Sequence, residues 1–407
     1  MATTGVRPRG LALLVLAALT GAALAILFLP RSACSHDACP DISAPPVALK
    51  VDFAPTTFAK LAGWAEDDHA AALAAFRLSC KAIAADASRF ADHEGFGSPE
   101  AWAAACGEAL TASDAKSFFE SRFEPVVLAG REGRSGRVTG YYEPELKGSR
   151  TRSDAYPAAA LARPDDLITA DPVAFRPILR GERLSGKVVD GMLVPYESRA
   201  EIEAGSLGRR ATALLYLASA ADAFFLQIQG SGRIALAEGG QVRLAYAAQN
   251  GRPYTAIGAA LIARGEIASG DMSMQAIRAW LDSHPGEAAE VMNLNESYVF
   301  FREQPLPDPS VGPDGAEGVP VTPGRSIAVD DGVYPYGVPL FVTARIGAAD
   351  GTGQEEVRRL MIAQDTGGAI RGVVRADYFF GWGPEAERRA GATNGALRIV
   401  LLRPKSA

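Results

Sequence analysis

Histidine is scarce in this sequence, which has four in 407 residues: His36, His69, His93 and His284. Only His36 has cysteines close to it, and no other histidine lies at metal-ligand spacing from a second histidine or a cysteine. Zinc sites need grouped histidine or cysteine ligands, and Ser-His-Asp or Cys-His centres need a well-placed histidine. The sequence therefore argues against both kinds of site, and we expect neither a metal nor a cofactor.

The chain also lacks a run of lysine and arginine. It has 41 basic and 47 acidic side chains, and the resulting net charge of −6 is mild for this length. Proteins that bind nucleic acids usually present a basic surface, so we expect no nucleic-acid partner. Hydrophobic residues make up 48% of the chain, which is enough for a substantial core. The length is typical of two compact domains.

A long uncharged stretch lies at the N-terminus. Arg7 and Arg9 precede Gly10–Leu29, which contains no charged residue. A basic start followed by an apolar run of this length is typical of a signal peptide or a membrane anchor. We assign residues 1–33 to that segment and residues 34–55 to a linker. Cleavage and retention stay open, and in both cases we expect the body in the periplasm, attached to the membrane if the segment is retained.

Export makes disulfide bonds relevant to the four cysteines. Cys80 lies in an alanine-rich helix expected over residues 67–86, and Cys106 lies in a helix that opens with Ser98 and Pro99. Two adjacent antiparallel helices bring such sulfurs together, so we expect a Cys80–Cys106 disulfide. Cys34 and Cys39 remain a second candidate pair within the linker. A third helix is expected near residues 113–123.

The rest of the chain has the pattern of short strands and turns. Pro144 ends the first strand, and Glu238-Gly239-Gly240 is typical of a hairpin turn. Strands are expected at 136–143, 214–217, 223–228, 233–237, 241–247 and 298–302, with helices at 254–264 and 273–281. The segment 325–402 again consists of short strands. The fold class is therefore mainly β with N-terminal helices (α+β).

Two aspartates stand out in the C-terminal segment 361–391. Asp365 follows the apolar run 361–363, and Asp377 follows a second apolar run at 370–374. A carboxylate at the end of a strand is held rigidly and can still face a cleft, so both are candidate catalytic residues. The alternative is that each only caps a turn, because aspartate next to glycine commonly does so.

Amides and aromatic rings occur together in the middle of the chain. Gln227 and Gln229 share one face of the expected strand 223–228, and Asn250 to Tyr254 combine an amide, a guanidinium and a ring. Amides bind sugar hydroxyls and rings cover the apolar face of a sugar, so we expect Asn250 and Tyr254 to bind substrate. The alternative is that Asn250 forms a turn and that the glutamines are solvated. Tyr141 and Tyr142 are consecutive in a strand, so only one of them can face a cleft.

Six motifs resemble those of the membrane-bound lytic transglycosylase A family, whose members cleave peptidoglycan. They are TGYYEP at 139–144, QIQGSG at 227–232, NGRPYTAIG at 250–258, DMSMQAIR at 271–278, NESYVFF at 295–301 and the segment 361–391. The resemblance implies a double-psi β-barrel domain with a second β-barrel domain inserted into it and a substrate groove between the two. In this sequence the first would comprise residues 56–145 and 304–405, and the inserted domain residues 146–303.

The resemblance also implies the roles of individual residues. Asp377 matches the family's catalytic acid and base, and Asp365 matches its second active-site aspartate. The positions that match the groove lining are Thr139, Gly140, Tyr141, Tyr142, Gln229, Ser231 and Gly232. The implied partner is the peptidoglycan glycan strand, and proteins of cell-wall synthesis or division are further candidate partners.

The implied reaction cleaves the β-1,4 bond between N-acetylmuramic acid and N-acetylglucosamine and leaves a 1,6-anhydromuramic acid end. One carboxyl group can donate the first proton and accept the second, provided that it is protonated near neutral pH. We expect the pKa of Asp377 to be raised by burial beside Tyr378, Phe379 and Trp382, or by repulsion from Asp365. The alternatives are a glycan-binding protein without this reaction and a two-aspartate hydrolase.

Overall fold

The computed structural model describes residues 50–131, 133–172, 174–176 and 184–406. The expected signal or anchor segment, most of the linker and the Cys34–Cys39 pair lie outside these ranges. Within them, no helix has both the length and the apolar character needed to cross a bilayer. The last four residues of the expected linker, Asp52–Pro55, form strand β1.

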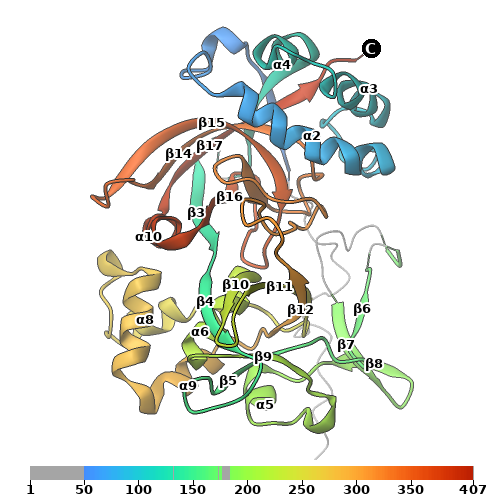
Figure 1. The fold of residues 1–407 in the computed structure, drawn as a ribbon. Coiled ribbons are helices and arrows are strands. Elements are labelled where there is room, and N and C mark those ends of the chain that lie inside the picture. The colour runs from blue at the N-terminus through green and yellow to red at the C-terminus, as the bar shows by residue number, and fades with distance from the viewer. Residues whose placement is uncertain (1–49, 132, 173, 177–183, 407) are drawn as a thin grey trace, which may run out of the picture. The chain divides into compact units, whose positions relative to one another are not determined.

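Eight strands form one sheet, in the order β1-β2-β17-β14-β15-β13-β16-β3. An additional pairing joins β17 to β3, so six of these strands close into a barrel (Figure 1). Within it β13–β15 and β16–β3 are parallel, and the other neighbours are antiparallel. The bounds are β1 (Asp52–Pro55), β2 (Phe123–Ala129), β3 (Gly136–Glu143), β13 (Ser326–Val329), β14 (Pro339–Gly347), β15 (Gln354–Asp365), β16 (Arg375–Trp382) and β17 (Asn394–Pro404).

Three N-terminal helices pack against this barrel: α2 (His69–Ala85), α3 (Pro99–Ala109) and α4 (Ala115–Arg122). The first two begin at side-chain caps, because Asp68 accepts from the amide of Ala71 and Ser98 from that of Ala101. The structure contains the Cys80–Cys106 disulfide, with 5.1 Å between the Cα atoms, and this bond fixes α2 to α3. The expected three helices are thus present, with boundaries within about two residues.

A second sheet of six strands has the order β12-β11-β10-β4-β9-β5. A bridge between Ala162 and Phe301 brings its two edges together, around a core that includes Leu215, Ile234 and Leu244. Its strands are β4 (Glu145–Ser149), β5 (Ala158–Leu161), β9 (Ala213–Leu217), β10 (Ser231–Leu236), β11 (Gln241–Gln249) and β12 (Val299–Pro305). This sheet lies between β3 and β13 in the chain, and we propose that it forms the inserted domain of residues 146–303.

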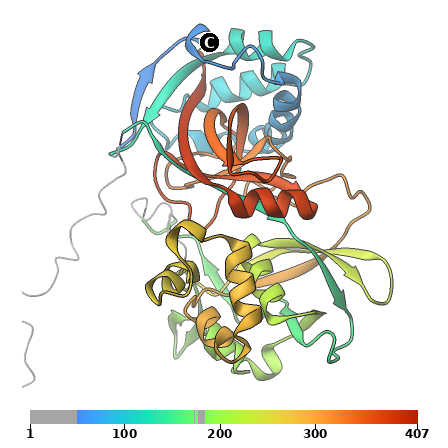
Figure 2. The same cartoon turned by 90° about the vertical axis from the view of Figure 1, so that its left-hand side faces the viewer.

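Helices and a small sheet surround the second sheet. Figure 2 shows α10 between the barrel and the region that contains α8, and a hydrogen bond from Gln275 of α8 to the carbonyl of Glu387 of α10 links them. The helices of this region are α5 (Arg199–Glu203), α6 (Ala220–Gln229), α7 (Ile257–Ala263), α8 (Met274–Ser283) and α9 (Pro285–Asn293), whereas α10 (Gly383–Ala392) packs against β3 and β16 of the barrel. A three-stranded sheet consists of β6 (Ile168–Ala170), β7 (Leu184–Val189) and β8 (Met192–Pro195).

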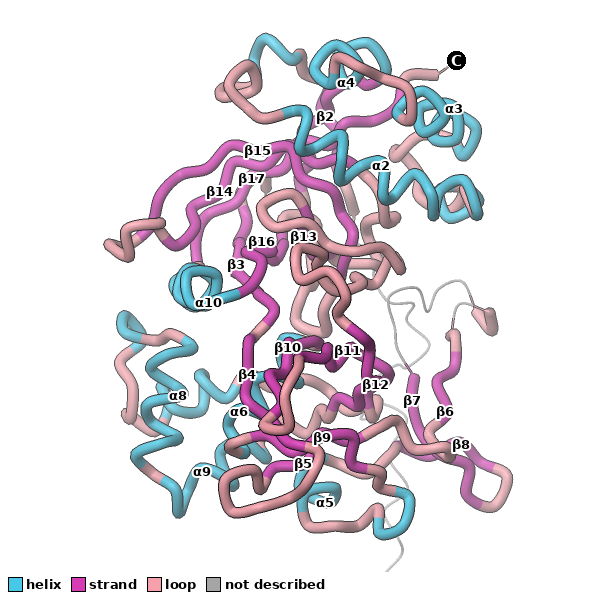
Figure 3. Tube along the Cα trace, in the orientation of Figure 1, coloured by secondary structure: helices cyan, strands magenta, loops and turns pink. Residues whose placement is uncertain are grey.

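Strand β3 of the barrel continues into β4 of the second sheet, with Pro144 as the one residue between them (Figure 3). The junction is fastened by Glu143, whose side chain is fully buried. Arg233 donates to its Oε2 at 2.8 Å, and Arg243 donates to its Oε1 at 2.6 Å. Both arginines also donate to the carbonyl of Val311, which belongs to the chain segment that returns to β13.

Three expectations about local structure are wrong. Residues 325–402 do not consist of short strands alone, because α10 lies among them and β15 has 12 residues. Residues 223–228 are not a strand but part of α6, which begins after the cap Ser219 and ends at Gly230, whose φ is 83°. Because α6 is buried on most of its surface, its sequence shows neither a period of two nor a clear period of 3.6. Residues 370–374 are not a strand either; Asp377 lies inside β16, which begins at Arg375.

Candidate active site

The barrel places the two aspartates on strands that flank β13. Ala328 of β13 pairs with Asp365 of β15 on one side and with Asp377 of β16 on the other. Neighbouring strands are about 4.8 Å apart, so the two aspartates are about 10 Å apart along the sheet. Ala328 has a small side chain, and it leaves open the space between the two carboxyl groups. The sheet order therefore brings together the two side chains that the sequence singles out.

Asp377 is held by a chain of two hydrogen bonds. The hydroxyl of Thr139, its neighbour on the parallel strand β3, donates to Asp377 Oδ1 at 2.8 Å. The same hydroxyl oxygen accepts a bond from Nη2 of Arg375 at 2.9 Å. Because that oxygen already accepts from Arg375, its own hydrogen points to Asp377. Oδ1 is thus occupied as an acceptor, and Oδ2 is left to carry and release a proton.

The pKa of Asp377 is raised to about 6, chiefly because the carboxyl group is buried. The charge of Arg375 and the hydrogen bond from Thr139 oppose this rise, and the charge of Asp365 adds to it. Of the rings expected to bury the carboxyl group, only Phe379 lines the cavity. Tyr378 faces the opposite side of β16, since side chains alternate along a strand, and Trp382 stacks on Arg233 at 3.8 Å.

Asp365 is the last residue of β15 and receives two backbone hydrogen bonds. The amides of Ala316 and Thr366 donate to its Oδ1 at 3.0 and 2.9 Å. Such donors stabilise a negative charge on the carboxylate. Tyr141 lies close to the same carboxylate, and burial, followed by the charge of Asp365, raises the pKa of the tyrosine hydroxyl well above its usual value. Tyr141 therefore stays protonated beside Asp365.

Both aspartates line a cavity of about 840 Å³, whose walls come from the barrel and from the second sheet with its helices. Thr139, Gly140, Tyr141, Tyr142, Gln229, Ser231 and Tyr254 also line it. The aromatic residues Tyr141, Tyr254 and Phe379 are in its lining, and its volume is large enough for several sugar units. A separate hollow of about 690 Å³ near Asp67 and Arg358 contains neither aspartate.

The side chains of the two consecutive tyrosines point to opposite sides of β3, as strand geometry predicts. The ring of Tyr141 packs on Phe379 with 5.0 Å between centroids, on the side of the aspartates. The ring of Tyr142 packs against Ala386 and Ala390 of α10, and its amide donates to Oε1 of Gln229 at 3.1 Å. Gln229 thus faces the groove from the end of a helix, while the strand predicted to carry it is absent.

Asn250 and Gly232 are not among the residues that line the cavity. The amide nitrogen of Asn250 is buried and donates to the carbonyls of Glu197 and Glu296. A side chain at Gly232 would meet Leu226 at 2.4 Å, so glycine is needed there for packing of α6 on β10. The structure therefore does not support the expected contact of these two residues with substrate. Both lie outside the cavity lining and stabilise the packing around it.

Sequence reasoning missed Arg375 and the loop that carries Ala316. Arg375 lies two residues before Asp377, so the period of β16 could have revealed it once the strand was recognised. No sequence signal connects Ala316 with Asp365, because they are 49 residues apart. In the described ranges, no group of three His, Cys, Asp or Glu side chains is arranged to hold a metal ion.

Comparison with known proteins gives matches along most of the described chain. The sequence matches the family models "MltA specific insert domain" over residues 137–302 and "3D domain" over residues 325–403. The membrane-bound lytic murein transglycosylase A of Escherichia coli strain K12 is 36% identical over 272 residues. That alignment covers 66% of this chain and 65% of the relative, so the match spans slightly less than two thirds of the E. coli protein.

Solved structures match over a larger share. The crystal structure of MltA from Neisseria gonorrhoeae has a TM-score of 0.71 and 33% identity, and the match covers 88% of this chain and 94% of that one. E. coli MltA with bound chitohexaose has a TM-score of 0.62 and 28% identity, with 88% and 95% covered. With the closed six-stranded barrel described above, these matches confirm the expected double-psi barrel fold.

Proposed function

We propose, from the premise that the chain belongs to the membrane-bound lytic murein transglycosylase A family, that it is a peptidoglycan lytic transglycosylase, a lyase. It would cleave the β-1,4 bond between N-acetylmuramic acid and N-acetylglucosamine. The observation that carries this proposal is the environment of Asp377, a carboxyl group in the cavity with a pKa raised to about 6. With this pKa, about half of the molecules hold Asp377 in its protonated form at pH 6 and about a tenth at pH 7.

In the first step the proton on Asp377 moves to the glycosidic oxygen, and the bond between that oxygen and C1 of the muramic acid breaks. The N-acetylglucosamine side leaves as an alcohol, and C1 becomes cationic. In the second step Asp377, now a carboxylate, takes the proton from the C6 hydroxyl of the same muramic acid. The C6 oxygen then bonds to C1 and closes the anhydro ring, so the proton returns to Asp377 and no water is consumed.

Asp365 has a different proposed role. Its carboxylate, held by two amides and facing the cavity, would stabilise the cationic sugar by charge and would keep the pKa of Asp377 high. Tyr141, Gln229, Ser231 and Tyr254 would contact the sugar rings and hydroxyls. The chitohexaose bound to the E. coli relative supports a glycan strand as the partner of this groove.

The structure of the sugar at the newly formed end of the product distinguishes this proposal from a two-aspartate hydrolase. Purified peptidoglycan sacculi incubated with the protein should release fragments that end in 1,6-anhydromuramic acid, measured by mass spectrometry. Asp377→Asn keeps the shape but removes both proton transfers, so release should fall by at least about 10²-fold while glycan binding persists. Fragments with a reducing muramic acid end would indicate hydrolysis, and binding without any fragment would indicate a glycan-binding protein.

We also propose a location in the cell envelope, in the periplasm, because the curated relatives are named membrane-bound. The uncharged segment Gly10–Leu29 would then direct export and, if retained, would hold the body at the membrane. Retention predicts that the protein stays with membranes in a high-salt wash, since apolar burial is not screened by ions. A soluble periplasmic protein whose N-terminus lies after residue 25 would establish cleavage.

A further inference from the structure

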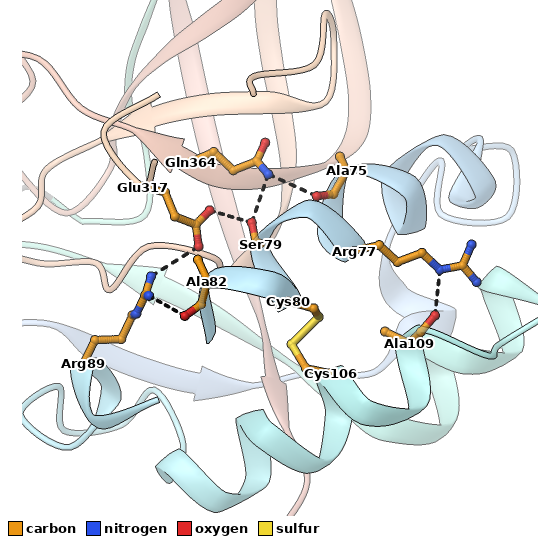
Figure 4. Close-up of a disulfide and its surroundings, with 10 residues drawn as sticks. All are labelled: Ala75, Arg77, Ser79, Cys80, Ala82, Arg89, Cys106, Ala109, Glu317 and Gln364. Atoms are coloured by element: carbon orange, nitrogen blue, oxygen red, sulfur yellow. Dashed lines mark hydrogen bonds and ion pairs between the residues drawn. A yellow bond between two sulfur atoms is a disulfide. The ribbon is translucent and has the colours of Figure 1, made fainter. Parts of the chain in front are cut away.

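Glu317 is a buried carboxyl group that the proposed mechanism does not use. Its side chain has no exposed surface, and burial raises its pKa to about 7. Figure 4 shows it between the barrel and the N-terminal helices, where its Oε2 accepts from the hydroxyl of Ser79 at 2.6 Å. Its Oε1 lies 3.4 Å from Nη1 of Arg89. A carboxyl group in such a place lowers the stability of the fold as pH rises from 4.5 towards 7, so its presence there calls for an explanation.

The backbone around Glu317 is bound to the end of β15. The amide of Ala316 donates to the carboxylate of Asp365, and the amide of Glu317 itself donates to the carbonyl of Gln364 at 3.1 Å. Two consecutive residues of the loop between β12 and β13 thus face two consecutive residues of β15. Gly315, Ala316 and Gly318 line the cavity, whereas Glu317 does not. Its side chain points away from the substrate, towards α2.

One serine links both sides of this contact. Ser79 donates to Glu317 and accepts from Nε2 of Gln364 at 2.9 Å, and Gln364 also donates to the carbonyl of Ala75 at 3.0 Å. Ser79 precedes Cys80, so the disulfide to α3 fixes the helix at this point. The loop with Ala316 and the strand with Asp365 are therefore fastened to the same turn of α2 (Figure 4).

We propose that Glu317 is a positioning residue, which fixes the carboxylate of Asp365 by holding the amide of Ala316 in place from outside the cavity. The role assigned to Asp365 rests on the proposed function, whereas the positioning itself does not. Glu317 acts through the hydrogen bond from Ser79, and an amide oxygen can accept that bond equally well. Loss of the anchor frees the loop, and Asp365 then loses a donor that fixes its orientation.

The test compares Glu317→Ala and Ser79→Ala, which remove the same bond from its two ends, with Glu317→Gln, which keeps an acceptor. Glu94→Ala is the matched control, because it removes the side chain of an exposed glutamate that makes none of the hydrogen bonds described above. Hydrogen–deuterium exchange of the Ala316 amide should be at least about 10-fold faster in both alanine variants and unchanged in the other two. Unchanged exchange in both alanine variants would overturn the positioning role. If one of them does not fold, the other decides.

Activity gives a second, separate readout. Release of anhydro fragments by Glu317→Ala should show kcat reduced about 10-fold with KM unchanged, because the substrate contacts remain. Adding Asp365→Asn to Glu317→Ala should cause little further loss, since both act on the same carboxylate. If the double variant loses activity by the product of the two separate losses, the inference is wrong. A wild-type protein that releases no anhydro fragments would overturn the proposed function, and the exchange rates of Ala316 would still decide the positioning role.

Discussion

At the scale of single residues, Asp377 is subject to opposing influences. Burial and the negative charge of Asp365 favour its protonated form, while Arg375 and the hydroxyl of Thr139 favour its ionised form. Arg375 bonds to Thr139 and to the backbone carbonyl of Ala376, and it makes no ion pair with Asp377. The guanidinium therefore orients the hydroxyl that binds Asp377, and its positive charge offsets only part of the rise in pKa that burial causes.

The activity should fall as pH rises through about 6. The reason is that Asp377 must be protonated to act as an acid, and its pKa is raised to about 6. Asp365→Asn removes a charge that raises this pKa, so the fall should move to lower pH in that variant. The measurement is the rate of anhydro-fragment release between pH 4 and 8.

Thr139→Val is the control for this pH profile, because it should shift the profile in the opposite direction. It removes a hydrogen bond that lowers the pKa of Asp377, so the fall in activity should move to higher pH. Profiles of the two variants that shift in the same direction, or that do not shift, would contradict the assignment of the titration to Asp377.

At the scale of helices and strands, the Cys80–Cys106 disulfide stabilises the fold by joining α2 to α3. Cys80 and Cys106 are 26 residues apart, and closing a loop of this size restricts the unfolded chain by roughly 3 kcal/mol. Cys106→Ser should lower the free energy of unfolding by about that amount, measured by urea denaturation. Mass spectrometry of the unreduced wild-type protein should find neither thiol open to alkylation. A variant as stable as wild type would contradict this account.

The sequence predicts capped helices and alternating strands well, because their signals are local. Ser98 and Pro99 mark the start of α3, and the strand expected at 136–143 has the same bounds as β3. It fails for α6, since a buried helix leaves no periodic pattern. The pairing of Ala328 with both aspartates could not be predicted from the sequence either, because it depends on strand order, which no local signal encodes. The resemblance, in contrast, selected both aspartates without knowledge of that order.

At the scale of the whole described chain, the junction between the two sheets depends on one carboxylate. Glu143 forms ion pairs with both Arg233 and Arg243, and all three side chains are buried. Glu143→Gln should lower the free energy of unfolding by about 3 to 5 kcal/mol, because it leaves buried guanidinium groups without a counter-charge. Glu145→Gln, an exposed change two residues away, should have little effect. If Glu143→Gln and Glu145→Gln unfold at the same urea concentration, Glu143 does not stabilise the junction in this way.

The continuity of β3 and β4 has a mechanical meaning. One backbone carries Thr139, which binds Asp377, and a few residues later forms β4 of the second sheet, whose strands β10 and β11 contribute Ser231 and Gln249 to the cavity. A force that moves the second sheet relative to the barrel would therefore reach the backbone of Thr139 along covalent bonds, with the buried Glu143 ion pairs as a brace. Such a movement would displace the hydroxyl that orients Asp377.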